Sequence, residues 1–267
     1  MKKILLFILM LVLGTVSFAE NIVITSIQPL YSLTSYLTKG TDIKVYTPFG
    51  SDISMTMSKE AIREEGFDLS VAKKAQAVVD IAKVWPEDVI YGKARMNKIN
   101  IVEIDASYPY DEKMTTIFFS DYSNGEVNPY IWTGSKNLVR MVNIISRDLI
   151  RLYPQNKAKI EKNVNKFTND LLKLENEANE KLLSVDNPSV ISLSENLQYF
   201  LNDMNIYAEY VDYDSITAEN VANLIKDKGI KVVVSDRWLK KNVIKALKDA
   251  GGEFVIINTL DIPMDKD

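Results

Sequence analysis

The sequence predicts an α/β protein of two lobes, in which two parallel sheets are joined by one long backbone helix. Short β-rich runs alternate with helical segments in the first and last thirds of the chain, as in parallel sheets covered by helices on both faces. Between these parts, about thirty residues continue at helical spacing without Gly or Pro. The 267 residues suffice for one or two domains with a large core.

Residues 1–19 have the pattern of a secretory signal peptide. Lys2 and Lys3 give a basic start, residues 4–13 are an unbroken apolar run, and Ala19 is the small residue before a cleavage point at Glu20. The apolar run is too short to span a bilayer as an ordinary helix, which disfavours the alternative of an uncleaved anchor. The mature chain is therefore expected to begin at Glu20.

The N-terminal lobe is expected over residues 20–153. Pro29 suits the first turn of a helix that Gly40 ends. Ser135 begins a second helix that reaches about Leu152, just before Pro154. The β-rich runs predict strands at 22–25, 43–47, 77–81 and 99–104.

The linking helix is expected over residues 154–184. Its apolar residues recur at steps of four and three and form one stripe, while the opposite face carries Lys, Glu and Asn. A coiled coil is the alternative interpretation, but the stripe is short for one. The stripe consists of Ile160, Val164, Phe167, Leu171 and Leu174.

The C-terminal lobe is expected over residues 185–267, with four strands and three helices in strict alternation. Thr217 is expected to cap one helix that Gly229 ends, and Gly251 to close the next. This order predicts a second parallel sheet. The strands are expected at 190–194, 206–211, 230–234 and 253–258, and the helices at 195–204, 217–229 and 238–250.

Composition excludes several classes of function. The chain has no Cys, which excludes disulfides, zinc ribbons and thiol catalysis, and no His, which removes the Ser-His-Asp triad and the commonest transition-metal ligand. Its net charge of −4 argues against a nucleic-acid partner. No nucleophile, cofactor fingerprint or phosphate loop is recognisable. We therefore expect neither an enzyme nor an organic cofactor.

Topology alone predicts where a ligand binds. Open parallel sheets bind ligands outside the carboxyl ends of their strands. In the second lobe this rule selects Ser194, Glu195, Ser235 and Asp236, and in the first lobe it selects the expected loop at 50–58. A long irregular loop over 108–135, rich in Tyr, Asp, Asn, Gly and Pro, can reach the same cleft between the lobes.

Each of these residues also has a plain structural interpretation. Glu195 is an acid in the first turn of a helix, where it complements the helix dipole, and Asp236 is a capping acid before another helix. Met55 and Met57 suit packing within the loop better than a soft copper site. Tyr130 and Trp132 are large enough to plug the interface between the lobes. The sequence leaves these alternatives open.

The chain resembles the zinc/manganese-type (cluster A-I) solute-binding proteins of ABC importers over nearly all of its mature length. Residues 24–31 are similar to the opening strand and helix of that family, and residues 153–156 to the start of its backbone helix. Asn128, Pro129, Tyr130, Ile131 and Trp132 resemble its Asp-Pro-His-Ile-Trp motif. Residues 234–236 and 257–259 fall where its later strands end.

The resemblance also shows what this chain lacks. Where the family holds its metal with imidazoles, this sequence has Ser54, Tyr130 and Ser194. The family's acidic fourth ligand falls near Thr259, with Asp261 close by. The sequence also stops at Asp267, before the C-terminal helix that is usual in the family, so that the chain is either truncated or has a smaller second lobe. An oxygen-only site suits harder ions such as Mn²⁺, Mg²⁺ or Ca²⁺.

The resemblance implies a periplasmic solute-binding protein, monomeric, that works with an ABC permease and ATPase at the inner membrane. Its cargo would be a divalent metal ion, zinc or manganese, and without Cys it would not be a lipoprotein. The alternatives are a small polar organic ligand or metal chelate between Tyr130 and Trp132, or a protein partner with no solute. The expected metal ligands are Asp52, Glu195, Asp236 and Asp261, and the expected ligand-binding residues are Ser54, Tyr130, Trp132, Ser194 and Glu195.

Overall fold

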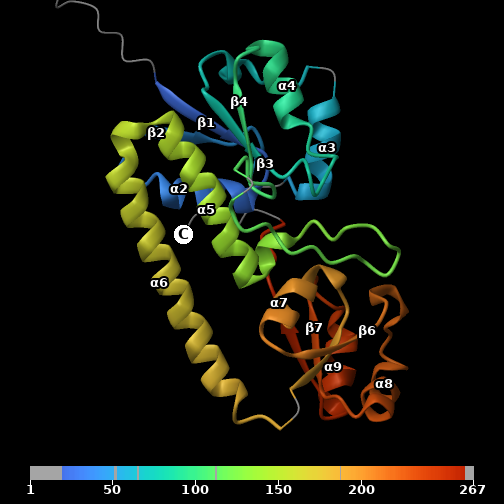
Figure 1. Cartoon of the computed structure of the whole chain (residues 1–267). Helices are drawn as coiled ribbons and strands as arrows, with labels where there is room; N and C mark the ends of the chain where they lie inside the picture. The colour runs from blue at the N-terminus through green and yellow to red at the C-terminus, as the bar shows by residue number, and fades with distance from the viewer. Residues whose placement is uncertain (1–19, 51–52, 65, 112, 187, 262–267) are drawn as a thin grey trace, which may run out of the picture.

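The computed structural model describes residues 20–50, 53–64, 66–111, 113–186 and 188–261. It shows two α/β lobes, one above the other in Figure 1, with a long helix running beside them. The expected signal peptide at 1–19 and the candidate ligand Asp52 lie outside the described residues. Within them, no helix is both long and apolar enough to cross a membrane.

The first lobe is built on a four-stranded parallel sheet of order β2-β1-β3-β4. Alternate side chains of β1 enter two separate cores, because successive residues of a strand point to opposite faces. Val23 packs with helices α2 (Gln28–Leu37) and α5 (Ser135–Leu152), whereas Ile24 packs on the other face. The strands are β1 (Asn21–Thr25), β2 (Ile43–Tyr46), β3 (Ala77–Asp80) and β4 (Val102–Asp105).

Two helices of this lobe were not expected from the sequence. The expectation of a loop over 50–58 is wrong in part, because α3 (Met55–Arg63) begins within it. Met55 is buried in the core while Met57 is exposed, so only the first supports the expected packing. The second helix, α4 (Ile90–Asn97), buries just Ile90 and Ala94, which is too short a stripe to recognise. One short 3₁₀ turn, η1 (Ser70–Lys73), precedes β3.

The second lobe repeats the same strand order, β6-β5-β7-β8, again fully parallel. Gly229 ends α8 in the left-handed conformation at φ 68°, as its position after the helix predicts. The helices that were expected from 217 and 238 begin three or four residues later. The elements are β5 (Ser189–Ser192), η4 (Glu195–Leu197), α7 (Gln198–Asp203), β6 (Tyr207–Tyr210), η5 (Tyr213–Ser215), α8 (Val221–Lys228), β7 (Val232–Ser235), α9 (Lys241–Asp249) and β8 (Glu253–Ile256).

An extended loop over 106–130 joins β4 to the turn η2 (Ile131–Thr133) and projects between the lobes (Figure 1). Its irregular backbone is fastened by single contacts, such as the antiparallel bridge between Asp121 and Val127. The side-chain amide of Asn137 on α5 donates to Phe118 O at 2.8 Å and its oxygen accepts from Phe118 N at 2.9 Å. The long irregular loop that composition predicts is therefore confirmed.

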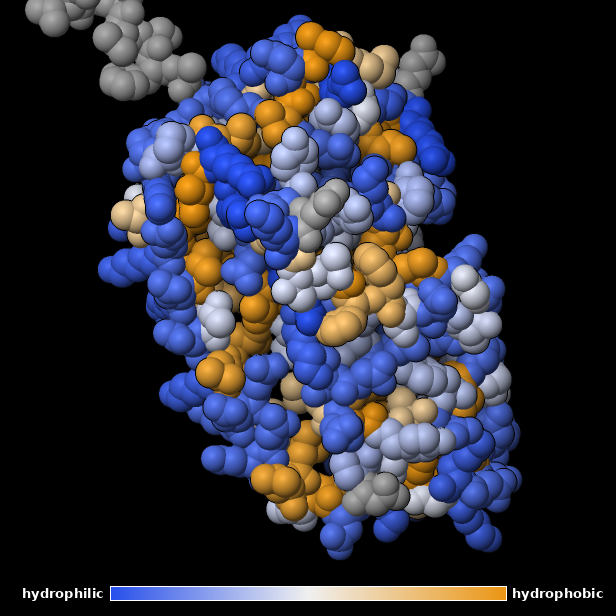
Figure 2. Space-filling view, in the orientation of Figure 1, coloured by the Kyte–Doolittle hydropathy of each residue, from blue (hydrophilic) through white to orange (hydrophobic). Residues whose placement is uncertain are grey.

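The long helix is α6 (Lys157–Leu182), preceded by the turn η3 (Pro154–Asn156). Its 26 residues span about 39 Å at 1.5 Å per residue. The first half packs on α2 and α5, where Ile160 is fully buried and Phe167 meets Tyr36 edge to face at 5.4 Å. The second half leaves Leu172 and Leu174 exposed. Figure 2 shows apolar residues along the inner side of the helix and polar residues on its outer edge.

Candidate functional site

A cleft of about 1250 Å³ lies between the two lobes. Its second-lobe wall comes from the carboxyl ends of β5 and β7 and from the segment after β8. Its first-lobe wall comes from the start of α3 and from the loop around Tyr122 and Tyr130. Parallel sheets bind ligands at the carboxyl ends of their strands, and this rule selects residues that line the observed cleft.

Ser54 lies in this cleft as the N-cap of α3. Its Oγ accepts a hydrogen bond from Met57 N at 3.2 Å and lies 3.0 Å from Thr56 Oγ1. A serine at this position satisfies a backbone N–H that has no partner inside the helix. The Ser54 side chain is mostly buried, and its observed hydrogen bond stabilises the start of α3.

Ser194 has a similar position in the second lobe, where it precedes η4 and accepts from Asn196 N at 3.3 Å. Ser54 and Ser194 stand at positions where the resembled family has imidazoles. In this chain both serines cap a helical turn at the cleft wall. This geometry follows from their place after a strand or loop and before a helix.

Tyr130 and Trp132 pack against each other, with ring centroids 5.0 Å apart. Tyr130 lines the cleft, as Asp261 does. Trp132 lies behind it, 5% exposed, and its Nε1 donates to Thr259 O at 2.7 Å. The structure thus places Tyr130 at the cleft surface and Trp132 in the joint between the lobes.

Glu195 lines the cleft but is held by the loop from the first lobe. Its Oε2 accepts from Ser123 N at 2.8 Å, and its backbone O accepts from the Asn128 side chain at 2.8 Å. The acid also stands in the first turn of η4, as the dipole interpretation requires. One carboxylate oxygen remains for other contacts.

Asp236 follows β7 and lines the cleft, with a side chain 7% exposed. Its Oδ2 accepts from Asn196 Nδ2 at 2.7 Å, and the side-chain oxygen of Asn196 accepts from Tyr122 OH at 2.7 Å. Its Oδ1 is buried and has no hydrogen-bond partner among the described residues, with Arg237 Nε 3.9 Å away. A buried carboxylate oxygen without a donor favours a ligand that brings a positive charge or an N–H group.

Asp261 joins the two lobes at the far wall. Its Oδ1 accepts from Met55 N at 3.0 Å, at the first turn of α3. Burial raises the pKa of this carboxyl, and nearby Asp236 raises it further, while the bond from Met55 N opposes both effects. A cation beside Asp261 would oppose this rise of its pKa.

Burial affects the hydroxyls of three tyrosines of the cleft, Tyr122, Tyr130 and Tyr210. Burial raises the pKa values of Tyr122 and Tyr130 far above the ordinary range, and it raises the pKa of Tyr210 to about 12. In the chain without a bound cation, their hydroxyls therefore donate and accept hydrogen bonds.

Several cleft residues were missed from the sequence. Tyr122 and Asn196 link the loop to Asp236, and Tyr213, Arg237 and Trp238 form part of the outer wall. Of these, Arg237 and Trp238 follow β7 directly, so the strand-end rule points to them as strongly as to Asp236. The side chains of Tyr122 and Tyr213 lie on loops that no periodic pattern marks.

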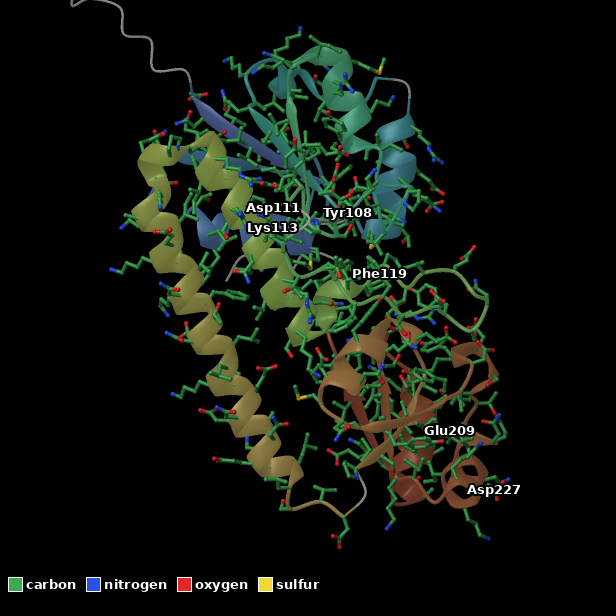
Figure 3. All side chains as sticks on the ribbon, in the orientation of Figure 1. Tyr108, Asp111, Lys113, Phe119, Glu209 and Asp227 are labelled. Atoms are coloured by element: carbon green, nitrogen blue, oxygen red, sulfur yellow. The ribbon has the colours of Figure 1, made fainter. Side chains whose placement is uncertain are left out.

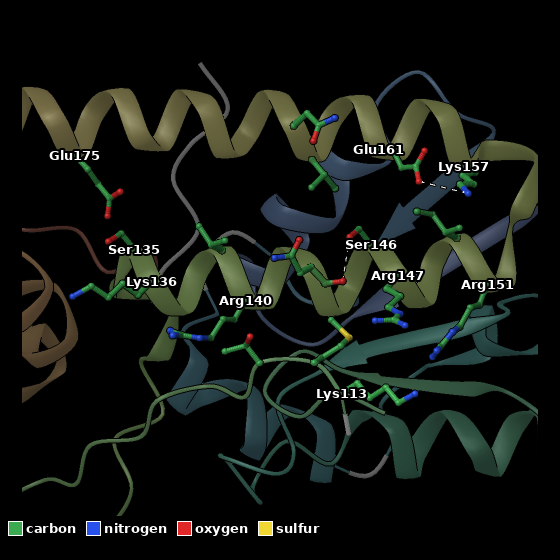
Figure 4. Close-up of a pocket in the computed structure, with 17 residues that line it drawn as sticks. Lys113, Ser135, Lys136, Arg140, Ser146, Arg147, Arg151, Lys157, Glu161 and Glu175 are labelled. Atoms are coloured by element: carbon green, nitrogen blue, oxygen red, sulfur yellow. Dashed lines mark hydrogen bonds and ion pairs between the residues drawn. The ribbon is translucent and has the colours of Figure 1, made fainter. Parts of the chain in front are cut away.

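A second hollow of about 1100 Å³ lies between α5 and α6 (Figure 4). Basic side chains dominate its rim, and several are paired, as Arg147 is with Asp111 at 2.6 Å and Lys136 with Asp203 at 3.1 Å. Figure 3 shows Asp111 and Lys113 beside α5, on the segment after β4. A hollow with this charge does not suit a metal cation, so the cleft between the lobes is the better candidate.

Comparison with known proteins gives a consistent picture. Residues 23–266 match the family model described as zinc-uptake complex component A periplasmic. The chain is 24% identical over 197 residues to a metal ABC transporter substrate-binding lipoprotein, SsaB, of Streptococcus sanguinis. It is 23% identical over 198 residues to a manganese ABC transporter substrate-binding lipoprotein, scaA, of Streptococcus gordonii. Each match covers 73% of this chain but 59% of the relative, about three fifths of its length.

Solved structures share the fold. The metal-dependent lipoprotein YcdH of Bacillus subtilis superposes with a TM-score of 0.70 at 16% identity, covering 90% of this chain and 89% of its own. The two-lobed arrangement with a long helix is therefore the fold of this group of structures.

Proposed function

Because the chain belongs to the family described as zinc-uptake complex component A periplasmic, we propose that it is the solute-binding protein of an ABC importer and carries a divalent metal ion. Zinc and manganese are the candidates, since the family description names the first and the Streptococcus gordonii relative the second. The cation is cargo, not a resident cofactor. In this proposal the protein binds and releases but performs no chemistry.

One observation carries the proposal: three acids from distant parts of the second lobe face one cleft. Glu195 follows β5, Asp236 follows β7 and Asp261 follows β8. Asp236 presents a buried oxygen that has no hydrogen-bond partner among the described residues, with Arg237 Nε 3.9 Å away. Hard divalent cations prefer oxygen ligands of this kind, and Zn²⁺ accepts them too. Asp52, in the segment before Ser54, remains a further proposed ligand.

The site of action in this proposal is the periplasm, reached through cleavage before Glu20. The curated relatives are lipoproteins, but the printed chain has no cysteine to carry a lipid, so we propose the free form. Its partners would be a permease and an ATPase at the inner membrane. It would meet them as a monomer.

The test is the metal content of the isolated protein. The chain, isolated without chelators, should carry close to one zinc or manganese ion, measured by inductively coupled plasma mass spectrometry. Asp236→Asn should lose most of that metal, because it removes the partnerless carboxylate oxygen. Asp227→Asn is the matched control, because Asp227 lies on α8 at the end of the second lobe away from the cleft (Figure 3). Metal-free protein, or equal loss in both variants, would contradict the proposal.

A further inference from the structure

We propose that the cation enters the cleft as a complex with a small nitrogen-donor organic chelator, whose carbon skeleton rests on an aromatic wall formed by Tyr210, Tyr213 and Trp238. This inference rests on the proposed function and specifies the chemical class of its cargo. It follows from four features of the cleft: its space, its donors, its outer wall and its charge.

The cleft has far more space than a single cation needs. Its volume of about 1250 Å³ exceeds the range of about 300–1,000 Å³ typical of small-molecule sites. An ion coordinated directly by protein side chains needs its donors within about 2.0–2.6 Å, which demands a tight enclosure. Space of this size suits an ion that brings an organic shell.

The protein does not supply a complete set of donors. The chain has no His and no Cys, so it has no nitrogen or thiolate ligand of the kind that zinc prefers. Within the described residues, no three acids converge closely enough to hold a metal ion. One oxygen of each of Glu195, Asp236 and Asp261 already accepts a hydrogen bond from the protein. The missing donors must then come from the ligand.

The outer wall is built for an organic surface. The Arg237 guanidinium lies over the Tyr213 ring, with Cζ 4.1 Å from the centroid. The Tyr213 hydroxyl donates to Trp238 O at 2.7 Å, which locks the loop after β6 to the loop after β7. Trp238 is nevertheless 69% exposed, a large apolar surface left uncovered at the mouth of the cleft. A hydrated ion gains nothing from such rings, whereas a chelator with a flat face stacks on them.

The charge of the cleft selects a cationic complex. Among the described lining residues, the acids Glu195, Asp212, Asp236 and Asp261 outnumber the single cation Arg237. A divalent ion with a neutral or singly charged chelator keeps a net positive charge and satisfies this lining. An amine or imidazole N–H of the chelator can donate to Asp236 Oδ1, and tyrosine and tryptophan faces attract cationic groups.

The test compares the ion and the complex on the full chain. ZnCl₂, L-histidine and an equimolar mixture of both serve as probes in calorimetric titration, with MnCl₂ as a repeat, and native mass spectrometry identifies the bound species. We expect the mixture to bind about tenfold more tightly than ZnCl₂, with one ion and one histidine added to the mass. Trp238→Ala should weaken the mixture about threefold to tenfold and leave ZnCl₂ unchanged. Tyr110→Ala, an equally drastic loss of an exposed ring outside the cleft, should change neither.

The other outcomes separate this inference from the proposed function. Equal affinity for ZnCl₂ and the mixture overturns the inference and leaves metal transport standing. Equal binding of L-histidine with and without metal overturns both, since the cargo would then be organic. An equal loss of affinity for both probes in Trp238→Ala overturns the aromatic wall.

Discussion

Asp80 at the carboxyl end of β3 is buried in the first lobe, and neither of its carboxylate oxygens has a hydrogen-bond partner among the described residues. Asp88 lies close to it, fully enclosed, with Oδ2 accepting from Ser26 Oγ at 2.5 Å and from Ile81 N at 3.2 Å. Burial raises the pKa of Asp80 well above the ordinary value, and Asp88, Asp105 and Glu103 raise it further. Burial also raises the pKa of Asp88 to about 7.

These raised pKa values predict a pH dependence of stability. The folded state holds protons that the unfolded chain releases near pH 4, so the free energy of unfolding falls as pH rises from about 4 to about 7. Each such proton contributes about 1.4 kcal/mol per pH unit in that window. Asp80→Asn should therefore be more stable than the natural chain at pH 7, with a smaller gain at pH 4.5, in urea unfolding.

Asp227→Asn serves as the control, because Asp227 is exposed on α8. It should follow the natural chain at both pH values. The same gain for Asp80→Asn at both pH values would show that its carboxyl is ionised throughout, against the burial argument.

At the scale of single elements, the two halves of α6 are stabilised by different interactions. Its first half is stabilised by packing, with Ile160 fully buried between α2 and α5. Its second half depends on helix propensity and on exposed ion pairs such as Lys173 with Glu177, which contribute little each. The apolar stripe read from the sequence is therefore buried along only part of its length.

Substitutions along the stripe should separate the two halves. Ile160→Ala should lower the free energy of unfolding by about 2–5 kcal/mol, because it leaves a cavity in the core. Leu174→Ala, at a side chain 62% exposed, should change it by less than about 0.5 kcal/mol. Urea unfolding followed by circular dichroism measures both. A large loss in Leu174→Ala would mean that this side chain packs within the fold, and it would contradict the division of the helix into a packed half and an exposed half.

At the scale of the whole molecule, the loop over 106–130 ties the lobes together. The Tyr199 hydroxyl on α7 accepts from Ser120 N at 2.9 Å and donates to Asn128 O at 2.9 Å. Asp203 of the same helix accepts from Lys136 N at 3.0 Å at the start of α5. These contacts hold the two cleft walls at a set distance, so large closing motions would have to break them.

Tyr199→Phe should loosen this joint. It leaves the half-buried Ser120 N–H and the buried Asn128 carbonyl without the tyrosine hydroxyl, at a cost of about 1–3 kcal/mol in urea unfolding. Tyr207→Phe is the matched control, because Tyr207 is 60% exposed and its hydroxyl donates to Glu209 on the surface. Its effect should stay within about 0.5 kcal/mol. Equal effects in the two variants would mean that the Tyr199 bonds contribute nothing to holding the lobes.

Much of the fold follows from local patterns. The eight strands lie within a few residues of their expected positions, since the period and composition of a buried strand are written in its own residues. The end of α8 at Gly229 follows from the backbone freedom of that residue alone. The expected strand at 99–104 begins too early, because Ile99 is 73% exposed in the turn before β4. The sequence did not predict the helices α3 and α4, because each buries few side chains and so leaves no clear apolar stripe.

By itself, the sequence determined two parallel sheets, the long helix and the cleft edge on which Glu195 and Asp236 stand, because short-range periodicity and strand ends encode them. Only the tertiary structure decided that Asn196 joins Tyr122 to Asp236, that Met55 N meets Asp261, and that Trp132 turns from the cleft to Thr259. These pairs lie far apart along the chain. The contacts of Tyr122 with Asn196, of Met55 with Asp261 and of Trp132 with Thr259 form when the lobes dock, and the contact of Asn196 with Asp236 forms when two strand ends of one sheet come together. No local pattern of residues records either event.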